Sequence, residues 1–296
     1  NEYSFAVRSL YEPAEGWKIA LAEDLLCNTL DSNIPECPSP IRLSSVSALS
    51  AKYEAQRINI SASLVSTYTK EEVSTGNAAS KRFRLSPMLG VSWLFHRDFR
   101  LRASYKDGFR MPTFNDLYYA RVGNVNLKPE TASQFNLGMT FTGSYDWGSA
   151  DITADAYYNF IKDKIVAVPT MFIWKMRNAG EVAMYGTDVT ASILWRACEW
   201  LKIHALANYS LQYALDVTDP DSKNYRHQIP YTPRHCGSGN LILETKWLNL
   251  AYRMSASGRR YSNNQNIPAN EISAYADHSI SLNREFNFGS SHDFKM

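Results

Sequence analysis

The feature that most constrains the fold is a strict alternation of apolar and polar residues over long stretches. Within 131–143 the apolar positions share one parity, at Phe135, Leu137, Met139 and Phe141, and polar residues or glycine fill the other. Side chains of a β-strand point alternately to its two faces, so this period predicts a strand with one apolar and one polar face. The pattern recurs over 151–160, 201–213 and 271–283. Such strands exceed the usual length of about 5–6 residues in soluble sheets and suit a tilted crossing of a bilayer.

We therefore expect two chemically distinct faces on the sheet. The residues expected to contact lipid are Phe135, Leu137, Met139, Phe141, Ile152, Ala154 and Ala156. The residues expected to face the lumen, or a domain inside it, are Gln134, Asn136, Asp151 and Asp155. A shift of the register by one residue would exchange the two sets, so the assignment is testable.

Connections between the predicted strands alternate between short and long. The short ones include 144–149, 197–200 and 245–249, and the long ones include 27–40, 70–82, 108–130, 163–180, 216–235 and 262–271. Short turns on one rim and long loops on the other are typical of outer-membrane barrels. Aromatic residues near strand ends fit the interfacial girdles of such barrels; they are Trp93, Trp147, Trp195, Trp200, Trp247 and Tyr252.

The predicted fold class is all-β, an antiparallel up-and-down transmembrane β-barrel of about thirteen strands. Bacterial single-chain barrels close with an even number of strands, so we expect the sheet to be partial. The chain opens in mid-pattern at Asn1, without a signal peptide, and we expect it to be a piece of a longer precursor.

Composition is compatible with this interpretation and excludes some others. Among 296 residues, 45% are hydrophobic and 20% are charged, which excludes a disordered chain. No apolar run is long enough for a transmembrane helix. The mean hydropathy of −0.34 suits a barrel, because half of each strand is polar. A net charge of +2 gives no reason to expect a nucleic-acid partner.

Cysteine and histidine spacing gives no sign of a cofactor or a catalytic centre. The cysteines form no CxxC pair, and the six histidines show neither HExxH nor triad-like spacing. We therefore predict no cofactor, no metal site and no enzyme. Cys27 and Cys37 flank one polar stretch, where a disulfide would suit an oxidising compartment; two unrelated thiols are the alternative.

The segment 104–131 carries an ordered set of motifs before the alternating strand. It contains Tyr105, Gly108-Phe109-Arg110, Pro112-Thr113, Asn115-Asp116-Leu117-Tyr118, Gly123-Asn124 and Asn126-Leu127-Lys128-Pro129-Glu130-Thr131. This series resembles a signature of TonB-dependent outer-membrane receptors, and the similarity extends from about Ala55 to the end of the chain. The resemblance implies a barrel of twenty-two strands around a globular plug. Residues 1–296 would then be the C-terminal part of that barrel, with the plug domain and the final strands absent from this chain.

The resemblance implies a function in uptake across the bacterial outer membrane. Such a receptor binds a scarce nutrient, such as a ferric siderophore, haem or cobalamin, and imports it when a TonB-type periplasmic coupling protein acts on the plug. Its partners would be its own plug domain, the coupling protein, the small ligand and outer-membrane lipid. The alternatives are a plugless outer-membrane porin and an outer-membrane barrel enzyme.

Residues 108–130 are expected to form a long loop that dips toward the pore mouth, with Gly123 and Asn124 in a turn of positive φ. The loop residues expected to contact a ligand or the plug are Arg110, Phe114, Asn115, Tyr118, Tyr119 and Arg121. The alternative is a structural role, in which Phe109, Pro112 and Leu117 pack the loop.

Further ligand candidates lie in the later loops. They are cationic and aromatic, which suits an anionic or aromatic ligand such as a ferric siderophore: Tyr225, Arg226, His227, Arg234, His235, Arg259, Arg260 and Tyr261. Haem receptors that share these motifs carry a histidine between them, and none lies between Arg110 and Asn126 here. Met111 and Val125 also depart from the haem-receptor pattern. The sequence therefore disfavours haem.

Overall fold

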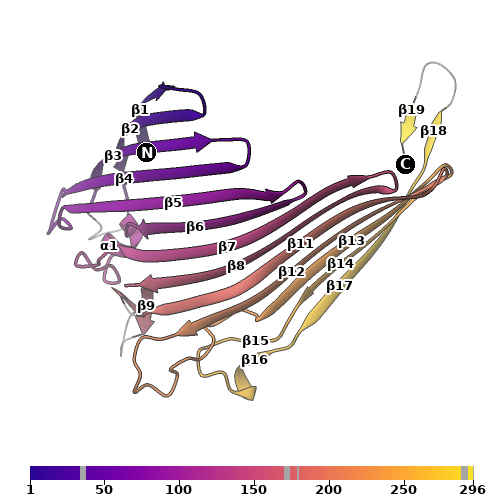
Figure 1. The fold of residues 1–296 in the computed structure, drawn as a ribbon. Coiled ribbons are helices and arrows are strands. Elements are labelled where there is room, and N and C mark those ends of the chain that lie inside the picture. The colour runs from indigo at the N-terminus through magenta and orange to yellow at the C-terminus, as the bar shows by residue number, and fades with distance from the viewer. Residues whose placement is uncertain (34–37, 170–173, 179, 288–292, 296) are drawn as a thin grey trace.

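A computed structural model describes residues 1–33, 38–169, 174–178, 180–287 and 293–295. Its main element is a sheet of thirteen strands (Figure 1). These strands are β1 (Glu2–Tyr11), β2 (Trp17–Thr29), β3 (Pro40–Glu54), β4 (Ile58–Val73), β5 (Arg82–His96), β6 (Phe99–Arg110), β7 (Glu130–Tyr145), β8 (Gly148–Lys162), β11 (Val182–Cys198), β12 (Leu201–Asp216), β13 (His235–Thr245), β14 (Asn249–Ser257) and β17 (Tyr275–Asn283). The prediction of about thirteen strands is confirmed.

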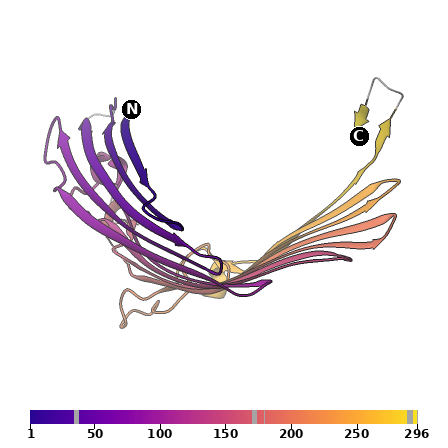
Figure 2. The ribbon, with the colours of Figure 1, turned by 45° about the horizontal axis from the view of Figure 1, so that its top comes forward.

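Every strand of this sheet pairs antiparallel with the next in chain order, which confirms the up-and-down topology. Figure 2 shows the sheet bent into an open trough with β1 along one edge and β17 along the other. Within the described part of the chain, β1 pairs only with β2 and β17 pairs only with β14. The sheet is therefore a partial barrel, as predicted.

The predicted division of the connections between two rims is confirmed, because an antiparallel meander places alternate connections at opposite ends. The long-loop rim carries three small elements (Figure 1). They are the helix α1 (Phe114–Tyr118), the hairpin β9 (Ile165–Pro169) with β10 (Trp174–Asn178), and the hairpin β15 (Arg260–Tyr261) with β16 (Glu271–Ile272). A 3₁₀ turn covers Pro268–Asn270, and β18 (Glu285–Asn287) pairs with β19 (Asp293–Lys295).

Two predicted boundaries were wrong. The expected strand 271–283 is divided, because β16 pairs with β15 at the rim while β17 joins the large sheet. The expected loop 70–82 is shorter, because β4 continues to Val73 and keeps pairing with β3. Glu71 therefore lies on a strand, in the ladder beside Arg42, although its sequence neighbourhood is as polar as a loop.

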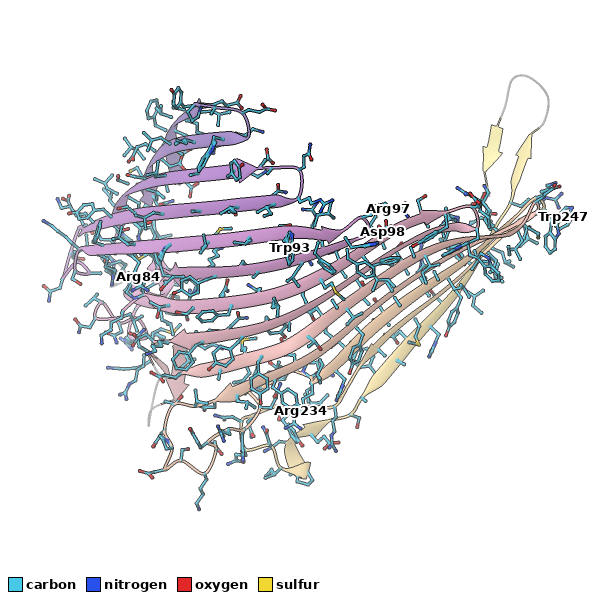
Figure 3. The ribbon with its side chains drawn as sticks, viewed as in Figure 1. Arg84, Trp93, Arg97, Asp98, Arg234 and Trp247 are labelled. Carbon is cyan, nitrogen blue, oxygen red and sulfur yellow. The ribbon has the colours of Figure 1, made fainter. Side chains whose placement is uncertain are left out.

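The register of β7 and β8 places the two predicted sets of residues on opposite faces of the sheet, and the contact of one face with lipid stays a prediction. Leu137 lies opposite Ala156 and Phe141 lies opposite Ile152 on one face, whereas Asn136 lies opposite Tyr157 on the other. The apolar face is well exposed, and Leu137 alone keeps 55% of its surface accessible. Figure 3 shows side chains projecting from both faces along the whole sheet. No helix among the described residues is long and apolar enough to cross a bilayer.

Aromatic side chains gather at the short-turn rim, as an interfacial girdle would. Tyr145 stacks on Trp147, and Trp200 lies 5.6 Å from Trp247 between ring centroids. Trp93 sits near the end of β5 and Trp247 in the turn before β14 (Figure 3). Amphipathic rings of this kind favour the boundary between hydrocarbon and water.

The two open edges predict the behaviour of the isolated 296-residue chain. Backbone groups in hydrocarbon must be paired, and an unpaired edge strand promotes association with another chain. We expect the purified chain to associate through β1 or β17 when it is studied in detergent. Size-exclusion chromatography with light scattering should show dimers or larger species. A monodisperse monomer with a closed sheet would contradict this expectation.

Candidate functional site

The loop after β6 begins with a short helix that caps itself. In α1, the Thr113 hydroxyl accepts from the Asp116 N–H at 3.2 Å, and the Asp116 carboxylate accepts from the Thr113 N–H at 2.8 Å. This reciprocal capping satisfies two N–H groups that a helix start otherwise leaves unpaired. The motif residues Thr113 and Asp116 therefore serve the local structure of the loop.

Apolar residues of the loop form a small core at the long-loop rim. Leu117, Tyr118 and Leu127 cluster with Ala79 and Ile165, and Leu117 keeps only 2% of its surface exposed. Val73, Phe114, Val125 and Met176 pack around this cluster. The loop is thus held against the wall and against the β9–β10 hairpin, which confirms the structural alternative for Leu117.

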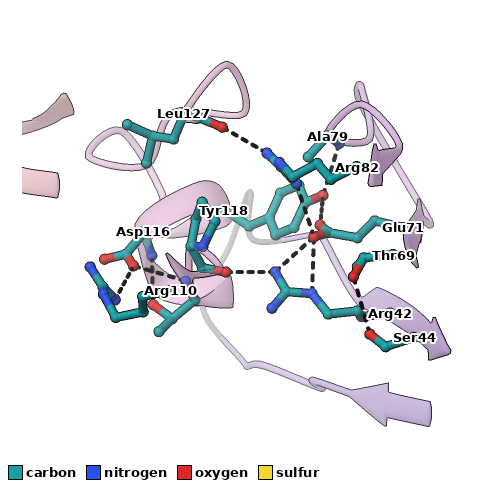
Figure 4. Close-up of polar contacts among 12 residues, drawn as sticks. Arg42, Ser44, Thr69, Glu71, Ala79, Arg82, Arg110, Asp116, Tyr118 and Leu127 are labelled. Carbon is teal, nitrogen blue, oxygen red and sulfur yellow. Dashed lines mark hydrogen bonds and ion pairs between the residues drawn. The ribbon is translucent and has the colours of Figure 1, made fainter. Parts of the chain in front are cut away.

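A buried carboxylate, Glu71 on β4, ties the loop to the sheet (Figure 4). Its Oε1 accepts from Arg42 Nε at 3.0 Å and Nη2 at 2.7 Å, and Arg82 Nη1 lies 3.5 Å away. The Tyr118 hydroxyl donates to the other oxygen of Glu71. Both arginines also reach the loop backbone, Arg42 at the Pro112 carbonyl (2.6 Å) and Arg82 at the Leu127 carbonyl (2.8 Å).

The network lies on the face of the sheet that was predicted to face the lumen. Following the register from β7 through β6, β5 and β4 places Arg42, Glu71 and Arg82 on the same face as Gln134. The loop therefore folds onto this polar face, and its dip toward the pore mouth stays a prediction. Burial and the hydrogen bond to Glu71 raise the pKa of Tyr118 to about 12, so its hydroxyl remains a donor at neutral pH.

The predicted loop residues take different positions in this arrangement. Tyr118 is buried and its hydroxyl donates to Glu71, so the structure does not support it as a ligand contact. Phe114 lies under the Arg42 guanidinium, 4.9 Å from ring centroid to Cζ, and Arg110 is paired with Glu130 through two hydrogen bonds of 2.9 and 2.8 Å. Asn115, Tyr119 and Arg121 remain exposed at the loop surface.

The turn in this loop differs from the predicted one. The positive φ belongs to Arg121, at 64°, and to neither Gly123 nor Asn124. Gly123 is needed for another reason, since a Cβ there would lie 2.6 Å from the Leu117 carbonyl oxygen. A glycine motif in a sequence can thus reflect a close backbone approach as well as an unusual φ.

The second group of predicted residues lies where two long loops meet. Gln228, 2% exposed, accepts from the Ala214 N–H and donates to the Thr232 carbonyl. Its backbone N–H and carbonyl both bond the Asn266 side chain, at 2.8 and 2.9 Å. The loop after β12 is therefore joined to the loop after β15 by hydrogen bonds of buried and half-buried groups.

This junction leaves a cavity of about 340 Å³ between the two loops. Seven of the eight residues predicted in these loops line it, and Tyr225 lies beside one of them. The lining residues are Arg226, His227, Gln228, Thr232, Arg234, His235, Arg259, Arg260, Tyr261 and Asn266. A volume of this size is in the range of small-ligand sites. The structure therefore brings together predicted residues that lie up to 35 positions apart in the sequence, Arg226 and Tyr261.

The predicted inner-wall residues share one polar face. Asp155 accepts from Arg102 Nη2 at 2.8 Å, and Gly138 lies between them, where a Cβ would stand 1.9 Å from the Asp155 carboxylate. Asn136 donates to Ser104 at 3.4 Å, and Gln134 and Asp151 lie further along the same face. Their contact with a plug domain stays a prediction.

Sequence reasoning missed Arg42, Glu71, Arg82 and Gln228. The first three were missed because charged residues near a predicted loop suggest exposure to solvent. In the structure they lie at strand ends, on the polar face of the sheet. The sequence contained one usable signal. Arg42 and Glu71 stand at alternating positions of their strands that belong to the polar face. No such signal pointed to Gln228, because its role depends on Asn266, which lies 38 residues away in another loop.

Among the described residues no group of three or more His, Cys, Asp or Glu side chains could hold a metal ion. Cys27 lies on β2, but Cys37 is outside the described residues, so the disulfide stays a prediction.

Over most of its length the chain matches a known protein family. A family model described as "TonB dependent receptor-like, beta-barrel" matches residues 40–294. A 91-residue stretch is 36% identical to the vitamin B12 transporter BtuB of Vibrio vulnificus (strain YJ016), and it covers 30% of this chain and 14% of that protein.

Two solved structures show the same fold. The copper transporter OprC superposes with a TM-score of 0.75 at 13% identity, over 97% of this chain and 48% of that one. The FrpB iron transporter from Neisseria meningitidis (F5-1 variant) gives 0.71 at 14% identity, over 96% and 48%. The chain therefore spans about half the length of these structures, and only a small part of the curated relative.

Proposed function

Because the chain belongs to the TonB-dependent receptor-like β-barrel family, we propose that it forms part of the wall of an outer-membrane receptor. Family members are outer-membrane β-barrels that act as receptors and transporters. The receptor containing this chain would capture a scarce nutrient at its long-loop rim and admit it by TonB-coupled transport. It would perform no covalent chemistry.

The observation that supports this proposal best is the position of the loop 111–129. It is folded onto the inner face and anchored there by Glu71, Arg42 and Arg82. A wall whose inner face is polar and partly covered by an anchored loop suits a receptor with a gated interior. The apolar outer face and the aromatic short-turn rim support a place in the outer membrane.

The candidate nutrients are a ferric siderophore, haem, cobalamin or a similar compound. Cobalamin enters through the vitamin B12 transporter to which part of this chain is similar, and iron and copper through the transporters that share its fold. The cavity between the loops is where we propose that the nutrient is first held. Its predicted contacts include Arg226, Arg234 and Arg260.

Uptake by cells tests the proposal. A strain that carries the full-length receptor should accumulate a labelled nutrient, and the accumulation should stop when the TonB-type protein is deleted or the proton gradient is collapsed. Matched cells without the receptor give the background. Accumulation that is unaffected by both treatments would instead identify a diffusion porin and would contradict the proposal.

A further inference from the structure

Glu23 lies on the apolar face of the sheet, at the midpoint of β2. Following the register from Leu137 through β6, β5, β4 and β3 places Trp17, and therefore Glu23, on the same face as Leu137. Its neighbours along the strand on this face are Leu21 and Leu25, which keep 56% and 48% of their surface exposed. An acidic side chain is thus flanked by groups that suit hydrocarbon.

Aromatic side chains on the apolar face stand ten positions apart on three strands and mark the limits of a band. The pairs are Phe83 and Trp93 on β5, Phe135 and Tyr145 on β7, and Tyr185 and Trp195 on β11. Ten residues of a strand tilted as in outer-membrane barrels span about 25 Å, which is the height of their apolar outer band. Glu23 is six positions from Trp17, whose ring centroid lies 5.0 Å from that of Tyr53 at the short-turn end. The Glu23 carboxylate therefore lies near the middle of this band.

Two serines of β3 bind the Glu23 carboxylate. Ser45 donates to Oε1 at 2.7 Å and Ser47 donates to Oε2, and within the described part of the chain no cation pairs with Glu23. Elsewhere in the thirteen strands, all of which the structure describes, carboxylate and ammonium groups of this face occur only near the long-loop ends; they are Lys70, Glu72, Asp107 and Lys162. A carboxylate against acyl chains loses its hydration, so an ionisable residue inside a membrane indicates a function or a partner.

An imidazole lies at a similar depth near the other edge of the sheet. The register through β8, β11, β12, β13 and β14 places His278 of β17 on the apolar face. His278 is exposed, and Met254, directly opposite it, is seven positions from Trp247 of the short-turn rim. The Tyr252 hydroxyl lies 2.7 Å from His278 Nδ1. When this phenol donates to Nδ1, the neutral ring carries its proton on Nε2 and presents a donor to the surroundings.

One molecule cannot bring these two groups together. β2 and β17 are eleven strand positions apart, about 50 Å across the sheet, and Figure 2 shows them near opposite edges of the trough. A second copy in the same membrane can present its His278 to Glu23, because the two groups lie at a similar depth. Acyl chains are as apolar as leucine, so association within a membrane depends on packing and hydrogen bonds.

We propose that copies of the receptor associate side by side in the membrane, with Glu23 of one copy bonded to His278 of the next. The carboxylate accepts from imidazole Nε2, so each polar group replaces the water that hydrocarbon excludes. Because the two contacting surfaces differ, the interface is heterologous and can repeat into rows. This inference goes beyond uptake, and it rests on the proposed place of the apolar face in the outer membrane.

Cross-linking of the full-length receptor in lipid vesicles tests the proposal. In a background whose native cysteines are replaced by serine, one population carries Leu21→Cys and the other Ile280→Cys. Each residue lies two positions from its polar group on the short-turn side, and they are 56% and 70% exposed. We expect a short bis-maleimide to join the two populations to each other far more than to themselves. Joining of Leu21→Cys receptors mainly to themselves would show a two-fold contact and overturn the proposal, as would the absence of cross-links.

Exchanging the two residues tests the contact directly. Glu23→His and His278→Glu, each alone, should lower the apparent association constant about 3- to 15-fold, as for other polar contacts within membranes. The double exchange should restore it, because an acid and an imidazole again face each other. The constant comes from the dependence of cross-link yield on the ratio of protein to lipid. A double exchange as weak as the single variants would contradict the contact.

Glu72→Leu is the matched control for Glu23→Leu. Glu72 shares the face of Glu23 but lies at the long-loop end of β4, with 63% of its side chain exposed. We expect Glu23→Leu to weaken association and Glu72→Leu to leave it unchanged, and an equal effect of both would overturn the proposal. Gel migration before and after boiling shows whether each variant is folded.

The proposed function is judged separately from this contact. TonB-dependent uptake by a receptor that does not cross-link overturns only the lateral association. Uptake that is independent of the TonB-type protein overturns the function, whatever the cross-linking shows.

Discussion

Replacing Glu71 by alanine is expected to weaken the attachment of the loop 111–129 to the inner wall by about 3–5 kcal/mol. The side chain of Glu71 is only 1% exposed and accepts from Arg42, while Tyr118 donates to its second oxygen. Without the carboxylate, two buried or half-buried cations lose their counter-charge, and the cost of leaving them unpaired dominates. Hydrogen exchange of the full receptor should report the change at the Leu117 and Asn124 amides, which bond within the loop. Their exchange should accelerate about a hundredfold or more.

Glu72→Ala is the matched control for this experiment. Glu72 is the next residue of the same strand, points to the opposite face and pairs with Lys70 at 2.6 Å, with 63% of its side chain exposed. An exposed pair of this kind contributes about 0–1 kcal/mol. Similar exchange rates in the two variants would show that the buried network does not hold the loop.

Placing arginine at Leu137 is expected to cost about 2–4 kcal/mol in the free energy of folding into a bilayer. Leu137 lies midway along β7 and is 55% exposed on the apolar face. In a membrane its neighbours would be acyl chains, which cannot solvate a guanidinium. Urea titration of the full receptor in lipid vesicles, with the folded fraction read from gel migration before and after boiling, gives the free energy.

Asn136→Arg provides the control one residue away. Asn136 belongs to the inner face, beside Ser104, where an arginine can stay hydrated or pair with acidic groups. We expect its effect to be small. A large cost at Asn136 with a small one at Leu137 would mean that the faces are assigned the wrong way round.

The fold could be predicted from the sequence to a large extent, because its determinants are local. The alternation from Gln134 to Thr142 specifies the two faces of β7 without knowledge of any neighbour, and short turns such as 145–148 force antiparallel pairing. The number of strands follows from counting these units. The predicted strand boundaries were wrong where the local pattern favours one strand partner and the structure uses another. Ile272 has the parity expected for the large sheet, but its backbone pairs with Arg260.

The candidate site could be predicted only in part. The arginines and histidines of the later loops were found because cations in a long rim loop suggest an anionic ligand, yet nothing local showed that Arg226 and Arg260 share one cavity. That depends on Gln228 and Asn266, which join two loops separated by β13, β14 and β15. Tyr118 shows the opposite error, since an aromatic residue in a polar loop was expected to be accessible and is buried against Glu71.

The type of structure follows from local sequence patterns: long antiparallel strands, two opposed faces, long and short rims, and the family signature at 104–131. Packing of the loops against the sheet sets which loop residues support the fold and which stay exposed. The physical reason is that strand periodicity is set by each residue's own backbone geometry, whereas burial and pairing of a charge depend on groups brought near by the whole sheet. Arg82 and Arg260 are the same residue type near polar stretches, but one is paired with a buried carboxylate and the other has an unpaired buried donor.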